Sequence, residues 1–150
     1  MRLKTSYTAR EVAALTGLTA RQLQGWDAGR IFQAAISPRR TTAGGFTERR
    51  YSPVDLLELL ALAELRRRGF APAQLKLMME TLQHYFRRRL SETLDDAGEM
   101  RLLTDARGLF LRTRQGHIFD LLADPTQPLI TGDGLPLKPV TGKARTRRKR

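Results

Sequence analysis

The sequence predicts a mainly α-helical fold that opens with a pair of short helices and later turns into a small antiparallel β meander. Two capping-box patterns predict the pair, because Thr-Ala-Arg-Glu begins at Thr8 and Thr-Ala-Arg-Gln begins at Thr19. Between them Gly17 occupies a position typical of a helix end. A helix, a short glycine turn and a second helix form a helix-turn-helix, whose second helix enters the DNA major groove.

The apolar spacing places the two helices at about Ala9–Leu15 and Ala20–Ala28. The second helix is expected to bury Leu23 and Trp26, which lie three residues apart on one face. Three polar side chains are then left to point outward, namely Arg21, Gln22 and Gln24.

A long polar loop follows from Gln33 to Arg50 and contains Pro38, Gly44 and Gly45. We call it the wing loop. A loop of this length inside a compact domain is usually functional. Its arginines are expected to contact phosphates, which position a protein on DNA without reading sequence. They are Arg39, Arg40, Arg49 and Arg50.

Two further helices are expected after the wing loop. Ser52 offers a hydroxyl cap and Pro53 the first helical position of one of them, which Gly69 ends. The other begins near Ala73 and is expected to continue into the low nineties. It carries apolar residues at 4-3-4 spacing, which are Leu75, Met79, Leu82 and Phe86.

This seam is about two heptads long and has two interpretations. It packs onto its own domain, or it joins two chains. The polar run Arg87-Arg88-Arg89 beside it favours the second, so we expect a homodimer interface there.

Beyond residue 95 the period changes to that of strands. Three short strands are expected at Met100–Thr104, Leu109–Thr113 and His117–Leu122, packed on the long helix or on a second subunit. Proline-rich sequence from Asp124 onward predicts an extended, disordered tail. The expected divisions are a DNA-binding domain at 1–70, a long dimerisation helix at 71–95, a β meander at 96–123 and a basic tail at 124–150.

The formal net charge of +12 is concentrated at the two ends of the chain. Residues 1–70 carry 12 Lys/Arg against 6 Asp/Glu, and residues 138–150 carry 7 Lys/Arg and no acid. This distribution favours a polyanionic partner over a merely solubilising role for the charge. The tail is expected to add salt-sensitive, non-specific attraction to nucleic acid.

Several classes of function find no support. Cysteine is absent and the histidines are two, so no metal site, disulfide or thiolate nucleophile is expected. Gly44-Gly45 lacks the Lys-Ser/Thr of a phosphate-binding loop, and we expect neither an enzyme nor a cofactor. No apolar run is long enough to span a bilayer, and the N-terminus does not resemble a secretory signal. A cytoplasmic protein associated with the bacterial nucleoid is expected.

With these motifs in place, the first half of the chain resembles the MerR family of transcriptional regulators. The likeness covers roughly Tyr7 to Leu82 and depends on the order and spacing of several short motifs. They are Tyr7-Thr-Ala-Arg-Glu-Val-Ala, Thr19-Ala-Arg-Gln-Leu-Gln, Trp26 with Gly29, Gly45-Phe46, Arg49-Arg50-Tyr51-Ser-Pro-Val-Asp55-Leu and Leu65-Arg-Arg-Arg-Gly69-Phe70. The resemblance implies a winged helix-turn-helix, a homodimer on an inverted repeat of double-stranded DNA and, in many members, a promoter distorted so that RNA polymerase engages it.

The chain also departs from the family pattern. Gly25-Trp26 replaces the usual paired aromatics, Gln24 replaces an arginine, and Thr47-Glu48 lengthens the wing. Neither cysteines nor a large C-terminal ligand domain are present, which excludes the metal-sensing branch. The outline is similar to the small members that bind DNA without an evident effector.

Base reading is expected from the second helix. Arg21 suits guanine O6 and N7, and Gln22 or Gln24 suits adenine N6 and N7. Thr19 lies at the helix N-terminus, where free N–H groups favour phosphate. Tyr51 either packs at the base of the wing or places its hydroxyl on a phosphate. The expected DNA-binding residues are Thr19, Arg21, Gln22, Gln24, Arg39, Arg40, Arg49, Arg50 and Tyr51.

Three functions therefore compete. The first is a dimeric, sequence-specific transcription regulator of MerR type. The second is an architectural or accessory DNA-binding protein with little sequence readout. The third is an adaptor whose meander recruits a protein partner and whose basic regions bind RNA.

Overall fold

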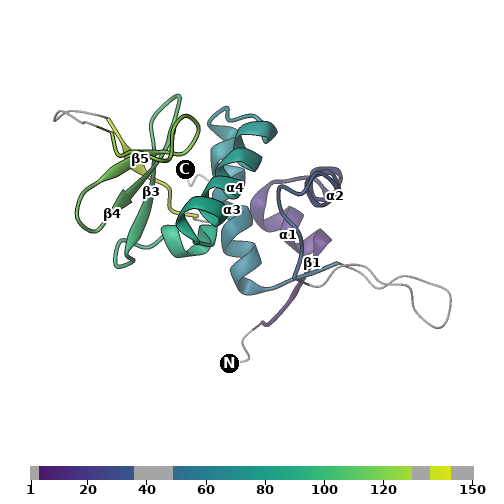
Figure 1. Ribbon diagram of the computed structural model, residues 1–150. Coiled ribbons are helices and arrows are strands. Elements are labelled where there is room, and N and C mark those ends of the chain that lie inside the picture. Colours follow the sequence, from purple (N-terminus) through teal and green to yellow (C-terminus); the bar gives the residue numbers. More distant parts are fainter. Residues whose placement is uncertain (1–3, 36–48, 130–135, 143–150) are drawn as a thin grey trace, which may run out of the picture. The chain divides into compact units, whose positions relative to one another are not determined.

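The structure, a computed structural model, describes residues 4–35, 49–129 and 136–142 (Figure 1). It divides into two compact units, one comprising Met1–Ala63 with Gly142–Arg150 and the other Glu64–Thr141. Among the described residues, no helix has both the length and the apolar character that crossing a bilayer requires.

The first unit holds the paired short helices. Its elements are β1 (Tyr7–Thr8), α1 (Ala9–Thr16), α2 (Ala20–Ala28), β2 (Arg50–Tyr51) and the start of α3 (Pro53–Arg67), a helix that continues into the second unit. β1 and β2 pair antiparallel with Tyr7 opposite Tyr51. These two strands join the N-terminal segment to the end of the wing loop, and the sequence patterns did not predict them.

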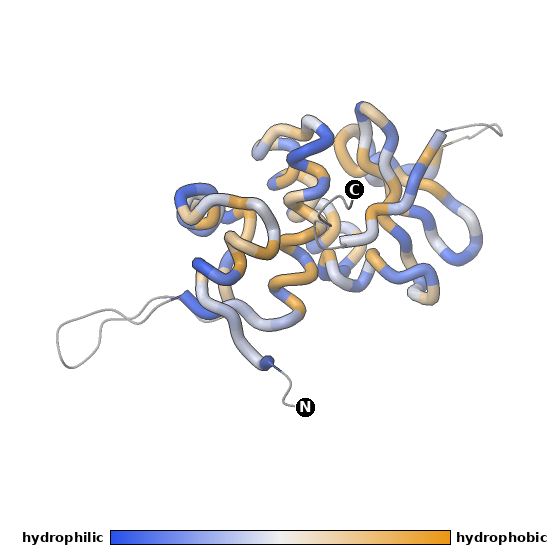
Figure 2. The backbone as a smooth tube through the Cα atoms, turned by 180° about the vertical axis from the view of Figure 1, so that it is seen from behind, coloured by the Kyte–Doolittle hydropathy of each residue, from blue (hydrophilic) through white to orange (hydrophobic). Residues whose placement is uncertain are grey.

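The predicted helix-turn-helix is confirmed down to its caps. Thr8 Oγ1 accepts the Glu11 N–H at 3.1 Å while Glu11 Oε1 accepts the Thr8 N–H at 3.0 Å. Gly17 lies in the left-handed region at φ 81°, where glycine avoids the Cβ clash, and its N–H closes α1 on Ala13 O. Val12 is fully buried on the inner side of α1, consistent with the interleaved apolar and polar residues along the helices in Figure 2.

The third helix also begins and ends at the predicted residues. Ser52 Oγ accepts the Asp55 N–H at 3.0 Å, and Asp55 Oδ2 accepts the Ser52 N–H at 2.9 Å. At the other end Gly69, at φ 104°, lets the Phe70 N–H turn back to Leu65 O.

The fourth helix is shorter than predicted. α4 spans Pro72–Phe86, and a separate 3-10 turn, η1, covers Leu90–Thr93. The helix ends because Arg87 adopts a left-handed conformation at φ 54°, from which the N–H groups of Arg87 and Arg88 both reach Leu82 O. The prediction of one helix through residue 95 was therefore wrong, because a non-glycine residue in the left-handed conformation leaves no sequence signal.

The second unit contains a four-stranded antiparallel sheet in the order β5-β4-β3-β6. Its strands are β3 (Met100–Thr104), β4 (Leu109–Thr113), β5 (Ile118–Asp120) and β6 (Lys138–Pro139). The first three confirm the predicted meander. Phe86, at the end of α4, meets Phe119 of β5 edge-on with 5.1 Å between ring centroids, so this sheet packs on the helix as expected.

The fourth strand corrects the prediction of a disordered tail from residue 124. Leu103 and Thr104 of β3 pair with Pro139 and Lys138, and Val140 is fully buried with its N–H on Leu102 O. A proline is compatible with this strand because β6 lies at the sheet edge. The first three helices lie largely where they were predicted. The part of the chain after α4 forms a four-stranded sheet, so the term "mainly α" does not fit the described residues as a whole.

Candidate nucleic-acid interface

The outer face of α2 is the surface on which sequence readout is expected. Leu23 and Trp26 are 3% and 5% exposed and fix the inner face of the helix. Arg21, Gln24 and Ala28 are exposed at i, i+3 and i+7, a spacing that places them in one stripe along the opposite face. We call Arg21, Gln24, Gly25 and Ala28 the α2 stripe. It offers two long polar side chains near the helix N-terminus and two small residues beyond them.

The N-terminus of α2 is closed by a reciprocal cap. Thr19 Oγ1 accepts the Gln22 N–H at 3.0 Å, and Gln22 Oε1 accepts the Thr19 N–H at 2.8 Å. Thr19 is exposed and retains its hydroxyl proton for a phosphate. Gln22 has its amide oxygen on the cap, so Gln24 is the better placed of the two for a bidentate contact to adenine.

An ion pair joins α2 to the end of the wing loop. Arg49 Nε lies 2.9 Å from Asp27 Oδ2, and the two side chains are 25% and 17% exposed. Arg49 was predicted as a phosphate contact. Its Nε is directed at the Asp27 carboxylate of α2, while a guanidinium has two further nitrogens with which to donate. Asp27 was not predicted as a site residue, since a single acid near a helix end carries no distinctive pattern.

The other two described residues of the wing-loop end have different environments. Arg50 is half-buried, and its Nη2 donates to Ser6 Oγ at 2.6 Å. Tyr51 is 2% exposed, which favours the packing interpretation of this residue over a hydroxyl on phosphate. Burial raises the pKa of the Tyr51 phenol, with Asp27 and Asp55 acting in the same direction and Arg49 opposing them.

A buried carboxylate anchors both ends of the wing loop. Asp55 is 1% exposed, and its Oδ2 accepts the N–H of Ala35 at 2.9 Å and that of Ser52 at 2.9 Å. The bond to Ser52 is part of the α3 cap, whose hydroxyl half the Ser-Pro-Val-Asp pattern predicts. The bond to Ala35 spans 20 residues and could not have been read from local sequence.

The remaining predicted residues fall into two groups. Arg39 and Arg40 lie outside the described residues. In the dimer seam Leu75 and Leu82 are 0% and 1% exposed within the single chain, so packing in their own chain already covers them. Met79 and Phe86 are partly exposed.

In a comparison with protein families, the profile of MerR HTH family regulatory proteins matches residues 7–82, about half of the chain. The match covers both capped helices, the wing loop, α3 and most of α4. A search of curated proteins found no match. Members of this family are DNA-binding regulators of transcription and not enzymes. With the capped helix pair and the basic end of the wing loop in place, the chain belongs to the MerR helix-turn-helix family.

Proposed function

We propose that this protein is a sequence-specific regulator that binds an inverted repeat in duplex DNA as a homodimer, with one α2 in each of two major grooves. The α2 stripe carries the proposal. It is the exposed face of a helix whose other face is buried and whose N-terminus is capped, so its side chains are presented on a fixed support.

Base reading in this proposal depends on two side chains. Arg21 lies in the first turn and takes guanine O6 and N7, and Gln24 follows one turn later for an adenine. Gly25 carries no side chain, and a Cβ placed there would meet nothing within 4 Å, so the helix is open to close approach at this point.

Phosphate contacts come from the surroundings of the stripe. The exposed α2 N-terminus favours an anion through its dipole and its N–H groups. Arg49, held by Asp27 beside the C-terminal turn of α2, directs its remaining nitrogens to the DNA backbone. Arg50, Arg39 and Arg40 are assigned to the same role from sequence.

A second chain is part of the proposal because the regulators of this family read inverted repeats. Apolar side chains remain exposed on α4, where Leu77 is 43% and Tyr85 is 52% exposed. The partly exposed Met79 and Phe86 lie on the opposite side of α4 from these two, so a dimer contact on either side would find more exposed apolar surface than Leu75 and Leu82 offer. Promoter distortion and contact with RNA polymerase belong to the same proposal.

Selection of bound fragments from random-sequence duplex DNA by the full-length protein tests the proposal. We expect a palindromic consensus, and a molar mass in solution of two chains per duplex by light scattering. Enrichment of a single half-site, or one chain per duplex at saturation, would contradict the dimeric regulator.

One observation favours the architectural alternative. Half of the α2 stripe, Gly25 and Ala28, has no side-chain hydrogen-bonding group with which to read a base edge. Uniform binding of any duplex, without an enriched motif, is the outcome that this second function predicts.

A further inference from the structure

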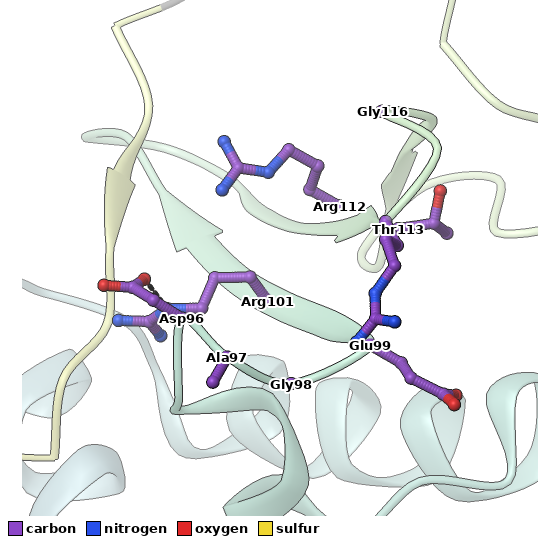
Figure 3. A pocket seen from close by; sticks show the side chains of 9 residues that line it. Asp96, Ala97, Gly98, Glu99, Arg101, Arg112, Thr113 and Gly116 are labelled. Atoms are coloured by element: carbon purple, nitrogen blue, oxygen red, sulfur yellow. Dashed lines mark hydrogen bonds and ion pairs between the residues drawn. The ribbon is translucent and has the colours of Figure 1, made fainter.

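The second unit contains a charged pocket that the DNA-binding role does not use. It has a volume of about 320 Å³ and lies between the turn that precedes β3 and the turn that joins β4 to β5 (Figure 3). The size is that of a small-molecule site, but the walls are strongly polar. Five charged side chains line it, namely Asp96, Glu99, Arg101, Arg112 and Arg114.

One of these arginines is buried and held by hydrogen bonds within the fold. Arg101 is 6% exposed. Its Nε donates to Asp96 Oδ1 at 2.8 Å, and its Nη1 donates to the carbonyl oxygens of Thr93 at 3.1 Å and Val140 at 2.5 Å. The guanidinium is therefore fixed in the wall of the pocket and cannot turn away from it.

A second arginine lies directly opposite the first. Arg112 of β4 is the register partner of Arg101 of β3, so the two side chains share one face of the sheet. Figure 3 shows the Arg112 side chain extending over the same side as Arg101 and Asp96. Like charges directly opposite each other destabilise a strand pair. The charge of Arg112 reaches Asp96, whose pKa is lowered first by its hydrogen bond to Arg101 and, in smaller part, by Arg112.

The charges around the pocket do not balance. Asp96 is paired with Arg101, and Glu99 is paired with Arg88, whose Nη2 lies 2.7 Å from Glu99 Oε2. Each carboxylate is thus neutralised by an arginine other than Arg112 or Arg114. In the described part of the chain, the side chains of Arg112 and Arg114 make no hydrogen bond or ion pair. Two exposed guanidinium groups therefore remain at the mouth of a pocket with a fixed third one in its wall.

We propose that this pocket binds a small anion bearing a phosphate or carboxylate group, with Arg112 and Arg114 as its ligands and Arg101 as the fixed positive wall. The planar fork of a guanidinium matches either group with two parallel hydrogen bonds. An anion there would pair with the two guanidinium groups that have no carboxylate partner among the described residues. This would give the sheet of the second unit a ligand of its own.

The test is calorimetric titration of the full-length protein with inorganic phosphate, and separately with citrate, at an ionic strength held constant with chloride. The matched variants are Arg112→Gln/Arg114→Gln at the pocket and Arg107→Gln at the β3–β4 turn. Arg107 is exposed and does not line the pocket. Arg21→Gln, on the proposed DNA surface, tests whether the anion binds at α2 instead of in the pocket.

We expect one saturable site for at least one of the two anions. The Arg112→Gln/Arg114→Gln variant should bind about tenfold more weakly or worse, because each charge-assisted hydrogen bond contributes at least that factor. Arg107→Gln and Arg21→Gln should bind as the parent does. Arg114→Gln alone, a change in a turn, should show an intermediate loss.

Two outcomes overturn the proposal. In one, the parent shows no saturable binding of either anion; if the double variant then also loses affinity for duplex DNA, the two arginines are assigned to nucleic acid. In the other, the parent binds an anion but the double variant binds it as tightly as Arg107→Gln does. Because DNA affinity is measured on the same proteins, failure of the anion site is distinguishable from failure of the DNA-binding role.

Discussion

The ion pair between Asp27 and Arg49 yields a prediction whose sign opposes simple electrostatics. Replacing Asp27 by alanine removes a negative charge beside the proposed DNA surface, and charge alone would make the protein bind DNA more tightly. In the structure, however, Asp27 Oδ2 holds Arg49 Nε at 2.9 Å, in a site where both side chains are at most one-quarter exposed. If Arg49 contacts a phosphate through its other nitrogens, Asp27 positions it, and Asp27→Ala should weaken DNA binding.

The magnitude follows from the ordering of one long side chain. Immobilising a side chain with many rotamers costs about 0.5–1.5 kcal/mol on binding, and a pair already formed in the free protein avoids that cost. The dissociation constant should therefore rise about two- to tenfold. Stability should fall as well, by about 1 kcal/mol, because the pair is intermediate between an exposed and a buried one.

The assay is fluorescence anisotropy on a labelled duplex at two salt concentrations. Asp27→Asn is the conservative variant, since its amide oxygen still accepts from Arg49 Nε, and it should bind between the parent and Asp27→Ala. Glu80→Ala, an exposed acid on α4, controls for net charge. If Asp27→Ala bound the duplex as tightly as Glu80→Ala, or more tightly, the positioning of Arg49 by Asp27 would be refuted. Arg49 would then be a structural partner of α2 only.

The other predictions concern the readout, the cap, the tail and one carboxylate. Arg21→Ala should cost about 1–3 kcal/mol on the preferred site and relax selection at one base position, whereas Arg107→Ala should not; equal losses on all sequences would contradict base reading by Arg21. Thr19→Ala should lower the free energy of unfolding by about 1 kcal/mol in urea, and Thr19→Ser should restore it. Removing residues 143–150 leaves the buried Val140 in the chain. It should lower the slope of log affinity against log salt concentration without changing the consensus sequence. An unchanged slope would show that the tail does not contact DNA. The hydrogen bond and charge of Arg101 hold the pKa of Asp96 below its ordinary 3.8, so this carboxylate stabilises the fold above that pH and loses its effect as the pH falls through the lowered pKa. Asp96→Asn should thus be less stable than the parent at pH 7 and converge with it in acid; a constant difference at all pH values would contradict this account.

Sequence patterns predict what depends on neighbours within one turn. Both capping boxes join residues three apart, as does the Ser52–Asp55 cap, and all three helix starts follow from them. The three strands of the meander follow from the change in apolar period after residue 95 and from the turn residues between the strands. These features are local, so the residues that form them can be recognised as a pattern in the sequence.

What the patterns miss depends on contacts made at a distance or on an unusual backbone. The end of α4 rests on a left-handed Arg87. β6 exists because Val140 is buried and its carbonyl accepts from Arg101, 39 residues away. Asp27 and Asp55 act on partners 22 and 20 residues away, so neither could be recognised as a site residue before the chain was folded.

The α2 stripe has only two long polar side chains with which to read bases. The degree of sequence specificity therefore depends on whether one chain or two chains bind the DNA. Two base-reading side chains, Arg21 and Gln24, discriminate by about 1–3 kcal/mol each, or about 2–6 kcal/mol for one half-site. Specific DNA-binding proteins prefer their sites over non-specific DNA by about 4–10 kcal/mol, so one copy of α2 reaches at most the lower part of that range. Two copies on an inverted repeat reach about 4–12 kcal/mol. With this helix, a chain that binds DNA alone would act as an architectural protein, and a pair of chains as a regulator with a defined operator. In the proposed homodimer, a contact between two chains would therefore do more than raise affinity, because it would supply the sequence specificity that one α2 lacks by itself.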